Sequence, residues 1–368
     1  MNWIKKIVVP AAISLGLYSG QLSAQPVTVT DIVGRKVTLK SPAKKVILGE
    51  GRAIITLALL HPDPVGLVAG WTGDFKKSGG LLFDEYQRRF PAMAKIPVIG
   101  ASGKETVSTE KIISLRPDVA IFGSGSHGPD AKSADVIRQL EAAGIPIVFV
   151  DFRLHPFKNT VPSIGILGKV LGREKQAGEY LAFYKEHYNK IAQRLKGKNL
   201  KKPRVYMEMI RGENLVGSPG KGNLGEFIDF VGGHNIGADI LPGEVGELNM
   251  EYVIRQQPDI YIATGIATPG APGLEIGYGI TAAQTQASLK KQVSRPVAAP
   301  LKAVQQKKVY AFWHLFYDSP LNIAAVDALA KWIHPELFKD VDPNATLKTI
   351  NDKFLAVPLN GTYFAELK

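Results

Sequence analysis

One long helix near the middle of the chain sets the strongest limit on its fold. From Arg173 to Lys196, apolar residues recur at alternating steps of four and three, the spacing of one helical face, at Ala177, Leu181, Tyr184, Tyr188, Ile191 and Leu195. Charged residues fill the other faces, and no proline interrupts the run. At a rise of about 1.5 Å per residue, the helix would be about 36 Å long, the width of a small domain. A rod of this length can join two domains.

The parts of the chain on either side of this helix resemble each other. Residues 107–123 read VSTEKIISLRPDVAIFG, and residues 248–265 read LNMEYVIRQQPDIYIATG. Each predicts a helix with a glutamate near its start, then Pro-Asp, then a buried strand. Glu110 and Glu251 precede their Pro-Asp pairs by the same interval. We therefore expect two similar α/β lobes joined by one stiff helix.

The length of the chain agrees with two domains, because 368 residues exceed one typical core. Helices alternate with strands in both halves, which favours central, mainly parallel sheets. We place an N-terminal α/β lobe at residues 25–160, a linking helix region at 161–202 and a C-terminal α/β lobe at 203–368. Residues 72–97 are polar, and we expect them to be an irregular surface segment.

The first 24 residues have the pattern of a signal peptide. A basic start, MNWIKK, precedes the apolar run IVVPAAISLGLYSG, and small residues follow up to Ala24. The run is short for a membrane span and contains Pro10, although an uncleaved anchor is the alternative. The sequence has no cysteine, which excludes disulfides, thiolate metal sites and a lipid-modified cysteine at the cleavage point. We expect a periplasmic protein without a lipid anchor.

The formal net charge of +12 indicates anionic partners, such as phosphate, carboxylate or catecholate ligands, or a membrane surface. The basic residues are scattered and form no block of the kind that binds nucleic acid, so we expect no nucleic-acid partner. A basic protein that its charge merely keeps soluble is the simpler alternative.

Candidate ligand-binding residues are those at the carboxyl ends of the predicted strands, where ligands of open parallel sheets bind. The candidates are Arg52, Trp71, Ser126, His127 and Arg153 in the first lobe, and Arg211, Trp313 and Tyr317 in the second. Guanidinium groups and aromatic rings together suit a flat or chelated anion, through paired hydrogen bonds and stacking. A solvated loop end or a local pair with a carboxylate is the alternative for each arginine.

Motifs typical of enzymes are incomplete. The glycine-rich residues 217–223 lack the spacing of a P-loop, and residues 124–128 lack the first glycine of a nucleophile elbow. The seven histidines are dispersed, without the spacing of metal ligands. We therefore predict no catalytic residue, no metal site and no cofactor. An exported enzyme on the same fold stays a weaker alternative.

The order of these features resembles a known family over nearly the whole mature chain. The signal peptide, the VTDIVGRKVTL hairpin, the strand leading into GEGRAIITLALL, the paired Glu–Pro-Asp units and the linking helix are similar to periplasmic substrate-binding proteins of ABC importers for ferric siderophores, haem and cobalamin. The resemblance implies two Rossmann-like lobes joined by one rigid α-helix. It also implies a ligand cleft between the lobes and only small changes of the lobe angle.

The resemblance further implies that one acidic residue on each lobe docks onto arginines of the permease. The matching positions are Glu110 and Glu251. The alternative is that each glutamate stabilises its own helix, because Ser108 and Asn249 have the pattern of N-caps and a glutamate favours the positive end of the helix dipole. Two glutamates at equivalent places on two lobes favour docking onto a permease dimer.

The ligand implied by the resemblance is an anionic iron chelate, above all a ferric siderophore, delivered by a monomeric binding protein. Haem, cobalamin or an oxyanion such as molybdate are alternatives, as is a sensor subunit that holds its ligand without an importer. Residues 72–97 and the C-terminal tail from His334 depart from compact members of the family. These departures weaken any direct transfer of a ligand from a smaller relative.

Overall fold

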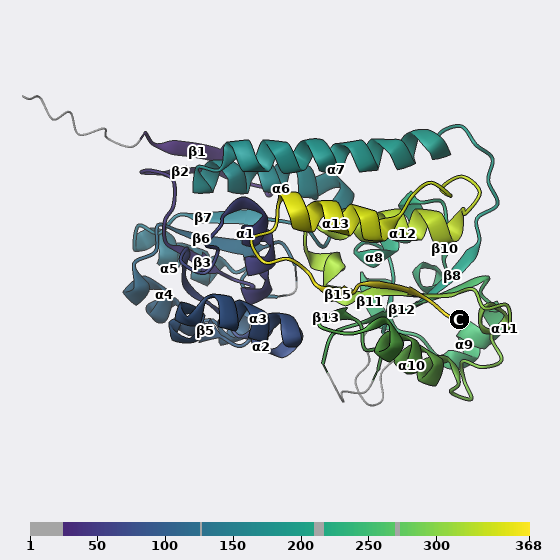
Figure 1. Ribbon diagram of the computed structural model, residues 1–368. Helices are drawn as coiled ribbons and strands as arrows, with labels where there is room; N and C mark the ends of the chain where they lie inside the picture. Colours follow the sequence, from purple (N-terminus) through teal and green to yellow (C-terminus); the bar gives the residue numbers. More distant parts are fainter. Residues whose placement is uncertain (1–24, 126, 210–216, 269–272) are drawn as a thin grey trace, which may run out of the picture.

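The computed structural model describes residues 25–125, 127–209, 217–268 and 273–368. Two five-stranded sheets form the centres of two lobes, and one long helix runs along both (Figure 1). The predicted α/β fold with two lobes and a linking helix is confirmed.

The sheet of the first lobe is parallel throughout. Its strands lie in the order β5-β4-β3-β6-β7, with bounds Val98–Gly100, Val68–Thr72, Val46–Leu48, Val119–Gly123 and Ile147–Val150. Alternate side chains face opposite sides of the sheet. Ile47 and Phe122 pack with α4 (Thr109–Leu115) and α5 (Ala134–Ala142). Leu48 joins the core of α1 (Ile54–Leu60) and α6 (Pro156–Leu171). The predicted hairpin is present as β1 (Val27–Thr30) and β2 (Lys36–Leu39).

The sheet of the second lobe is mainly parallel. Its strands lie in the order β10-β8-β12-β14-β16, with bounds His234–Asn235, Arg204–Glu208, Ile260–Gly265, Val309–Trp313 and Phe364–Glu366. Only β16, which comes from the C-terminal tail, pairs antiparallel. The helices of this lobe are α8 (Leu224–Phe230), α9 (Met250–Gln256), α10 (Ala282–Val293), α11 (Lys302–Gln305) and α12 (Asn322–Ile333). Two small antiparallel pairs flank the sheet: β9 (Gly217–Pro219) with β11 (Val245–Glu247), and β13 (Gly277–Tyr278) with β15 (Gly361–Thr362).

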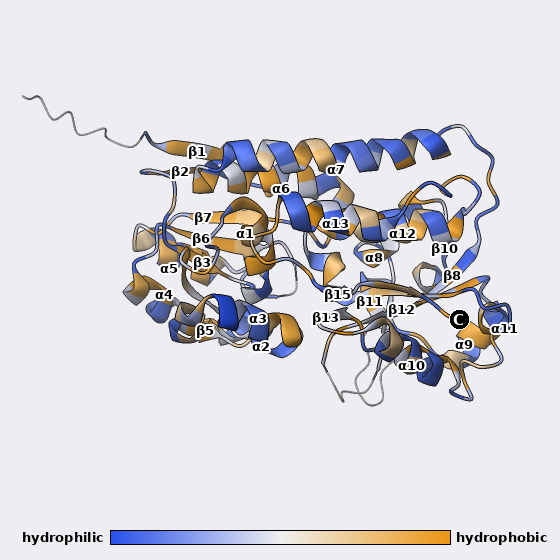
Figure 2. Ribbon diagram, viewed as in Figure 1, coloured by the Kyte–Doolittle hydropathy of each residue, from blue (hydrophilic) through white to orange (hydrophobic). Residues whose placement is uncertain are grey.

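The linking helix is α7 (Glu174–Leu195), which begins and ends one residue inside the predicted run. Its buried residues are Ala177, Tyr180, Tyr184 and Ile191, while the opposite face is hydrophilic (Figure 2). The hydroxyl of Tyr180 donates to the carbonyl of Pro320 at 2.6 Å, and Arg194 contacts Asp340. The helix is therefore fixed to the second lobe as well as to the first, against which it packs through α6 and α1.

Residues 72–97 are not irregular, and this prediction is wrong. They form α2 (Asp74–Ser78), α3 (Leu81–Arg89) and a 3-10 helix, Pro91–Lys95. Phe75, Leu82 and Tyr86 are buried, and the Phe75 and Tyr86 rings meet edge to face at 5.4 Å. The segment looked irregular because a Gly-Gly break and basic residues separate these three apolar positions.

The C-terminal tail forms a second bridge between the lobes. Helix α13 (Pro343–Lys353) packs against α12, and the chain then reaches the first lobe, where the amide of Ala356 donates to the carbonyl of Ala58 at 2.9 Å. The Phe354 ring meets that of Tyr180 edge to face at 5.2 Å. The tail returns to the second lobe as β15 and β16 (yellow in Figure 1). Two connections therefore limit how far the lobes can separate.

None of the described helices is both long enough and apolar enough to cross a bilayer.

Candidate ligand-binding site

Two arginines and a tyrosine from different lobes lie together where the sheets end. Arg52 lies in the 3-10 helix Gly51–Ala53, after β3, and Arg153 follows β7. Tyr317 belongs to the 3-10 helix His314–Asp318, which follows β14 of the second lobe. The guanidinium carbon of each arginine is 5.4 Å from the centroid of the Tyr317 ring. Of the predicted ligand-binding residues, the structure therefore brings these three together between the lobes.

Carboxylates that the sequence analysis did not select surround these arginines. Arg52 Nε is 2.7 Å from Asp318 Oδ2, 3.4 Å from Asp74 Oδ2 and 3.5 Å from Glu50 Oε2. Arg153 Nε is 3.8 Å from Glu244 Oε2. Glu50 and Asp318 could have been found, because each adjoins or nearly adjoins a selected residue at a strand end. We call Glu50, Arg52, Arg153, Tyr317 and Asp318 the interlobe cluster.

The interlobe cluster contains hydrogen-bond donors that the described residues leave unused. Arg52 Nη2 and Arg153 Nη1 are buried and have no hydrogen-bond partner among the described residues, and the same is true of Ser124 Oγ. A buried donor without a partner costs about 1–3 kcal/mol, so such groups are uncommon away from functional sites. An acceptor group on a ligand would remove this cost.

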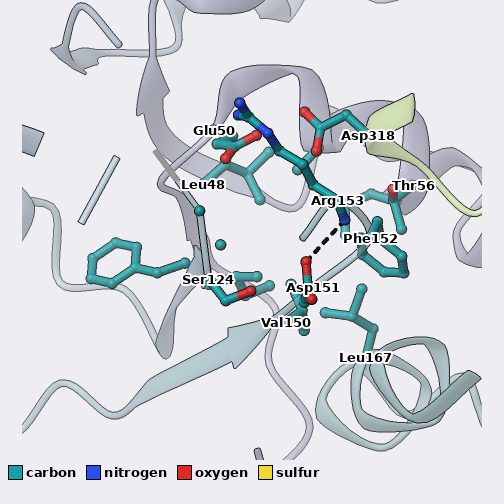
Figure 3. A pocket seen from close by; sticks show the side chains of 16 residues that line it. Leu48, Glu50, Thr56, Ser124, Val150, Asp151, Phe152, Arg153, Leu167 and Asp318 are labelled. Atoms are coloured by element: carbon teal, nitrogen blue, oxygen red, sulfur yellow. Dashed lines mark hydrogen bonds between the residues drawn. The ribbon is translucent and has the colours of Figure 1, made fainter. Parts of the chain in front are cut away.

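The loop that carries Arg153 is held by Asp151. Its carboxylate accepts hydrogen bonds from the amides of Arg153, Leu154 and His155, at 2.9, 2.8 and 3.1 Å. The first of these is drawn in Figure 3. Arg153 is thus presented by a fixed turn at the end of β7, which reduces the entropy lost when it binds a ligand.

Burial changes the protonation of several groups around the cluster. It raises the pKa of Glu50 well above its usual range, and the negative charge of the nearby Asp318 carboxylate adds to this, while Arg52 and Arg153 act in the opposite direction. Burial and the two arginines lower the pKa of His127 to about 4 and that of His314 to about 3. Both imidazoles are therefore neutral at pH 7. They bond to Ser102 Oγ at 3.0 Å and to Thr264 Oγ1 at 2.9 Å, respectively.

The two predicted tryptophans are largely inside the lobes. Trp71 is 5% exposed and meets Phe75 at 6.2 Å, and Trp313 is 1% exposed and meets Phe316 at 5.2 Å. Little of either ring is open to a ligand in this conformation. Ser126 and Arg211 lie outside the described residues. The binding roles of all the selected residues stay predictions.

A small cavity adjoins the cluster. Leu48, Val150, Phe152 and Leu167 form its apolar side, and Glu50, Arg153 and Asp318 lie at its polar side (Figure 3). The space open to the centres of water molecules is about 40 Å³, enough for only a few waters. A larger ligand would require Asp318 and its neighbours to move, or the lobes to separate.

The two helices that carry the predicted docking glutamates have the same construction. Ser108 Oγ accepts from the amide of Lys111 at 3.1 Å in α4, and Asn249 Oδ1 accepts from the amide of Glu251 at 2.8 Å in α9. Both N-caps are as predicted. Glu110 and Glu251 lie exposed in the first turns of their helices. The geometry agrees with helix stabilisation and with docking, so the docking role stays a prediction.

The repeat continues past the helices. Each helix ends at a residue in the left-handed conformation, Arg116 with φ 48° and Gln257 with φ 42°. The aspartate of each Pro-Asp pair then accepts hydrogen bonds from the chain entering a neighbouring strand. Asp118 accepts from the amides of Lys44 and Lys45, both at 2.8 Å, and Asp259 from that of Arg204 at 3.0 Å. The two lobes share this unit down to its backbone conformation.

Comparison with known proteins identifies the family of this chain. The sequence model described as "Periplasmic binding protein" matches residues 55–312. The chain belongs to the periplasmic binding protein family. It is a periplasmic-type substrate-binding protein of ABC transporters, a kind of protein that binds small molecules and interacts with a permease.

Three proteins illustrate the similarity of this chain to known proteins. The TroA-like periplasmic binding protein FepB from Veillonella parvula is 31% identical, with a TM-score of 0.82, and the match covers 93% of this chain and 100% of that chain. The uncharacterized ABC transporter substrate-binding lipoprotein YvrC of Bacillus subtilis is 26% identical, over 86% of this chain and 88% of its own. A cobalamin-binding protein of Halobacterium salinarum is 22% identical, over 71% and 68%.

Proposed function

We propose that this periplasmic binding protein captures a ferric siderophore between its lobes and delivers it to an inner-membrane permease dimer. The observation that carries the proposal is the meeting of Arg52 and Arg153 with Tyr317 across the gap between the lobes. The buried Nη2 of Arg52 and Nη1 of Arg153 lack partners among the described residues, and the oxygen atoms of an iron chelate would accept hydrogen bonds from them. The planar groups of such a chelate would stack on the tyrosine ring.

The lobes would move little when the ligand binds. Helix α7 and the C-terminal tail both join the lobes, so opening and closing would be limited to small movements. The ligand would displace Asp318 from Arg52 and fill the space beside the apolar side of the cavity. The turn that presents Arg153 is already held by Asp151, so little entropy of this turn would be lost on binding. The protein itself would perform no chemistry and need no cofactor, and it would act as a monomer.

Delivery would depend on Glu110 and Glu251. Both side chains are exposed, and one lies on each lobe in an equivalent position. A dimeric permease presents the same basic site twice, which fits a pair of equivalent acidic residues. The duplication of the lobes, rather than either glutamate alone, supports the docking role.

Cobalamin is the second candidate ligand. The Halobacterium salinarum relatives are described as cobalamin-binding. The carboxylates of Glu50 and Asp318 could accept hydrogen bonds from the amide groups at the edge of a corrin ring. The size of the present cavity favours neither a siderophore nor cobalamin.

Titration of the purified mature protein with ferrichrome, ferric enterobactin and cyanocobalamin, followed by tryptophan fluorescence, tests the proposal. We expect saturable quenching by at least one iron chelate and none by cyanocobalamin. The Arg52→Ala/Arg153→Ala variant should lose that binding, while Arg138→Ala, which removes an exposed arginine of α5, should retain it. Binding of cyanocobalamin alone would favour the second candidate and end the siderophore proposal.

The location in the cell is part of the same proposal. The signal-peptide pattern predicts export, and the chain has no cysteine to carry the lipid of a lipoprotein such as YvrC. Osmotic shock of the native host should release the mature protein, starting after Ala24, into the periplasmic fraction. Recovery with the membranes would contradict the prediction of an unanchored protein.

A further inference from the structure

Carboxyl groups match or outnumber the guanidinium groups at the interlobe cluster. This inference rests on the proposed function and concerns the charge of the chelate. Among the described residues, two guanidinium groups lie there, and four carboxyl groups approach them within 3.8 Å: Glu50, Asp74, Asp318 and Glu244. The arginines alone, read from the sequence, suggested an anionic ligand. The four carboxyl groups beside the arginines offset this positive charge.

The carboxyl groups differ in how firmly they are held. Asp74 accepts from the amide of Gly51 at 2.6 Å and from the hydroxyl of Thr72 at 2.7 Å, within its own lobe. It therefore stays beside Arg52 whether or not a ligand is bound. Asp318 and Glu244 belong to the second lobe and reach Arg52 and Arg153 across the gap. A ligand that enters between the lobes would meet these two carboxyl groups together with the arginines.

The neighbouring titratable groups add little positive charge. His127 and His314 are neutral at pH 7, because burial and the two arginines lower their pKa values to about 4 and about 3. Burial raises the pKa of Glu50 and that of Glu244. Even if both were protonated, the carboxylates of Asp74 and Asp318 would still lie against Arg52, two negative charges for the two guanidinium groups. The described part of the cleft therefore carries no excess of positive charge.

We infer that the cleft selects an iron chelate of little net charge, such as a ferric trihydroxamate, over a highly anionic one, such as a ferric tris-catecholate. Three hydroxamate groups balance the charge of the ferric ion, whereas three catecholate groups leave a large negative charge. An anionic chelate would be attracted by the arginines but would also lie close to the carboxyl groups of Asp318 and Glu244. Like charges in a desolvated interface repel each other and weaken binding. A neutral chelate can accept hydrogen bonds from the arginines without this repulsion.

The formal net charge of +12 does not oppose this selection. Its long-range field can raise the rate at which anions approach, but the affinity depends on the groups that touch the ligand. Exposed lysines, such as Lys348 on α13, lie outside the interlobe cluster. The charge of the surface and the charge of the cleft are therefore separate properties of this protein.

Separate titrations with two probes of different charge test the inference. The wild-type protein is titrated with neutral ferrichrome and with anionic ferric enterobactin at physiological salt. We expect ferrichrome to bind more tightly by about tenfold or more, the order expected when like charges meet in a buried site. Asp318→Asn and Glu244→Gln, separately, should narrow this ratio by tightening the binding of ferric enterobactin.

Asp352→Asn is the matched control, because Asp352 is exposed on α13 and pairs with Lys348. It should leave the ratio unchanged, and thermal melting checks that each variant is folded. Tighter binding of ferric enterobactin to the wild type would overturn the inference and leave the proposed function intact. Failure of both iron chelates to bind would end the proposed function, and the inference with it.

Discussion

The two lobes share a framework but bring different chemistry to the cleft between them. Helices α4 and α9 have the same kind of N-cap, the same left-handed ending and the same Pro-Asp pair bonded to a neighbouring strand entry. At the cleft, the described guanidinium groups, Arg52 and Arg153, come from the first lobe. The second lobe supplies the Tyr317 ring and the Asp318 and Glu244 carboxyl groups that reach across.

This difference separates what a repeated lobe must keep from what it can change. Caps and Pro-Asp pairs satisfy hydrogen-bonding groups at the ends of helices and the starts of strands, so they stabilise each lobe. The loops after the strands contribute less to the stability of the fold, so they can carry different ligand-binding groups in the two lobes. The glutamates of α4 and α9 are exposed and repeated, which is why we assign them to a partner that is itself repeated.

The largest effect expected is on transport. Glu110→Lys and Glu251→Lys together should abolish uptake in the native host, because the permease would meet two like charges instead of two opposite ones. Affinity for the ligand should not change, since neither residue touches the interlobe cluster. The two single variants should be impaired to a similar extent if the lobes dock equivalently. Normal uptake by the double variant would refute docking through these residues.

The next effect concerns ligand affinity. Arg52→Ala/Arg153→Ala should weaken siderophore binding by about 100-fold or more, since each charged hydrogen-bonding group contributes about 1.5–3 kcal/mol. Arg52→Lys/Arg153→Lys keeps the charge but loses the planar fork, so it should recover only part of the affinity. Isothermal titration measures both, after thermal melting has shown that the variants are folded. Unchanged affinity in the alanine variant would remove the arginines from the site.

The shared framework predicts matched losses of stability. Asp118→Ala and Asp259→Ala should each lower the free energy of unfolding by about 1–2 kcal/mol, since each removes hydrogen bonds to backbone amides at a strand entry. Asp352→Ala, which removes an exposed ion pair on α13, should cost under about 0.5 kcal/mol. Urea denaturation measures all three. A large loss in one lobe only would show that the two units are not equivalent.

The smallest effect is a pH dependence at Glu50. Burial, and then the Asp318 carboxyl, raises the pKa of Glu50 above its usual value of 4.5 in the folded protein. The folded state therefore holds this proton more tightly than the unfolded state. The resulting stability is present below the unfolded pKa and is lost as the pH rises through the folded pKa.

Glu50→Gln keeps a neutral side chain at every pH. Its free energy of unfolding should differ little from that of the wild type near about pH 4, and should exceed it increasingly as the pH rises toward about 8. Chemical denaturation at a series of pH values gives the difference. A difference that does not change with pH would show that Glu50 titrates normally.

Much of the fold could be predicted because its signals are local. The apolar stripe of α7 lies in one continuous run, and the Glu–Pro-Asp units repeat within a few residues of sequence. The helices of residues 72–97 were missed because their apolar positions, Phe75, Leu82 and Tyr86, are split by a Gly-Gly break. The antiparallel strand β16 was missed because its pairing with β14 joins residues far apart in the chain.

The site was predicted in part for a related reason. The topology of parallel sheets places Arg52 and Arg153 at the same edge, so their sequence positions were enough to select them. Their partners Asp318 and Glu244 come from the other lobe, and no local pattern in one sequence pairs them with the arginines. Trp71 and Trp313 also lie at strand ends, but their rings turn into the cores of the lobes.

A crystal structure of the protein with ferrichrome bound, with the iron located by anomalous scattering, tests the central claim most directly. The account predicts an iron peak between the lobes, with the chelate in contact with Arg52, Arg153 and the ring of Tyr317. An iron peak only on the outer surface of one lobe, with the interlobe cluster unchanged, would contradict it.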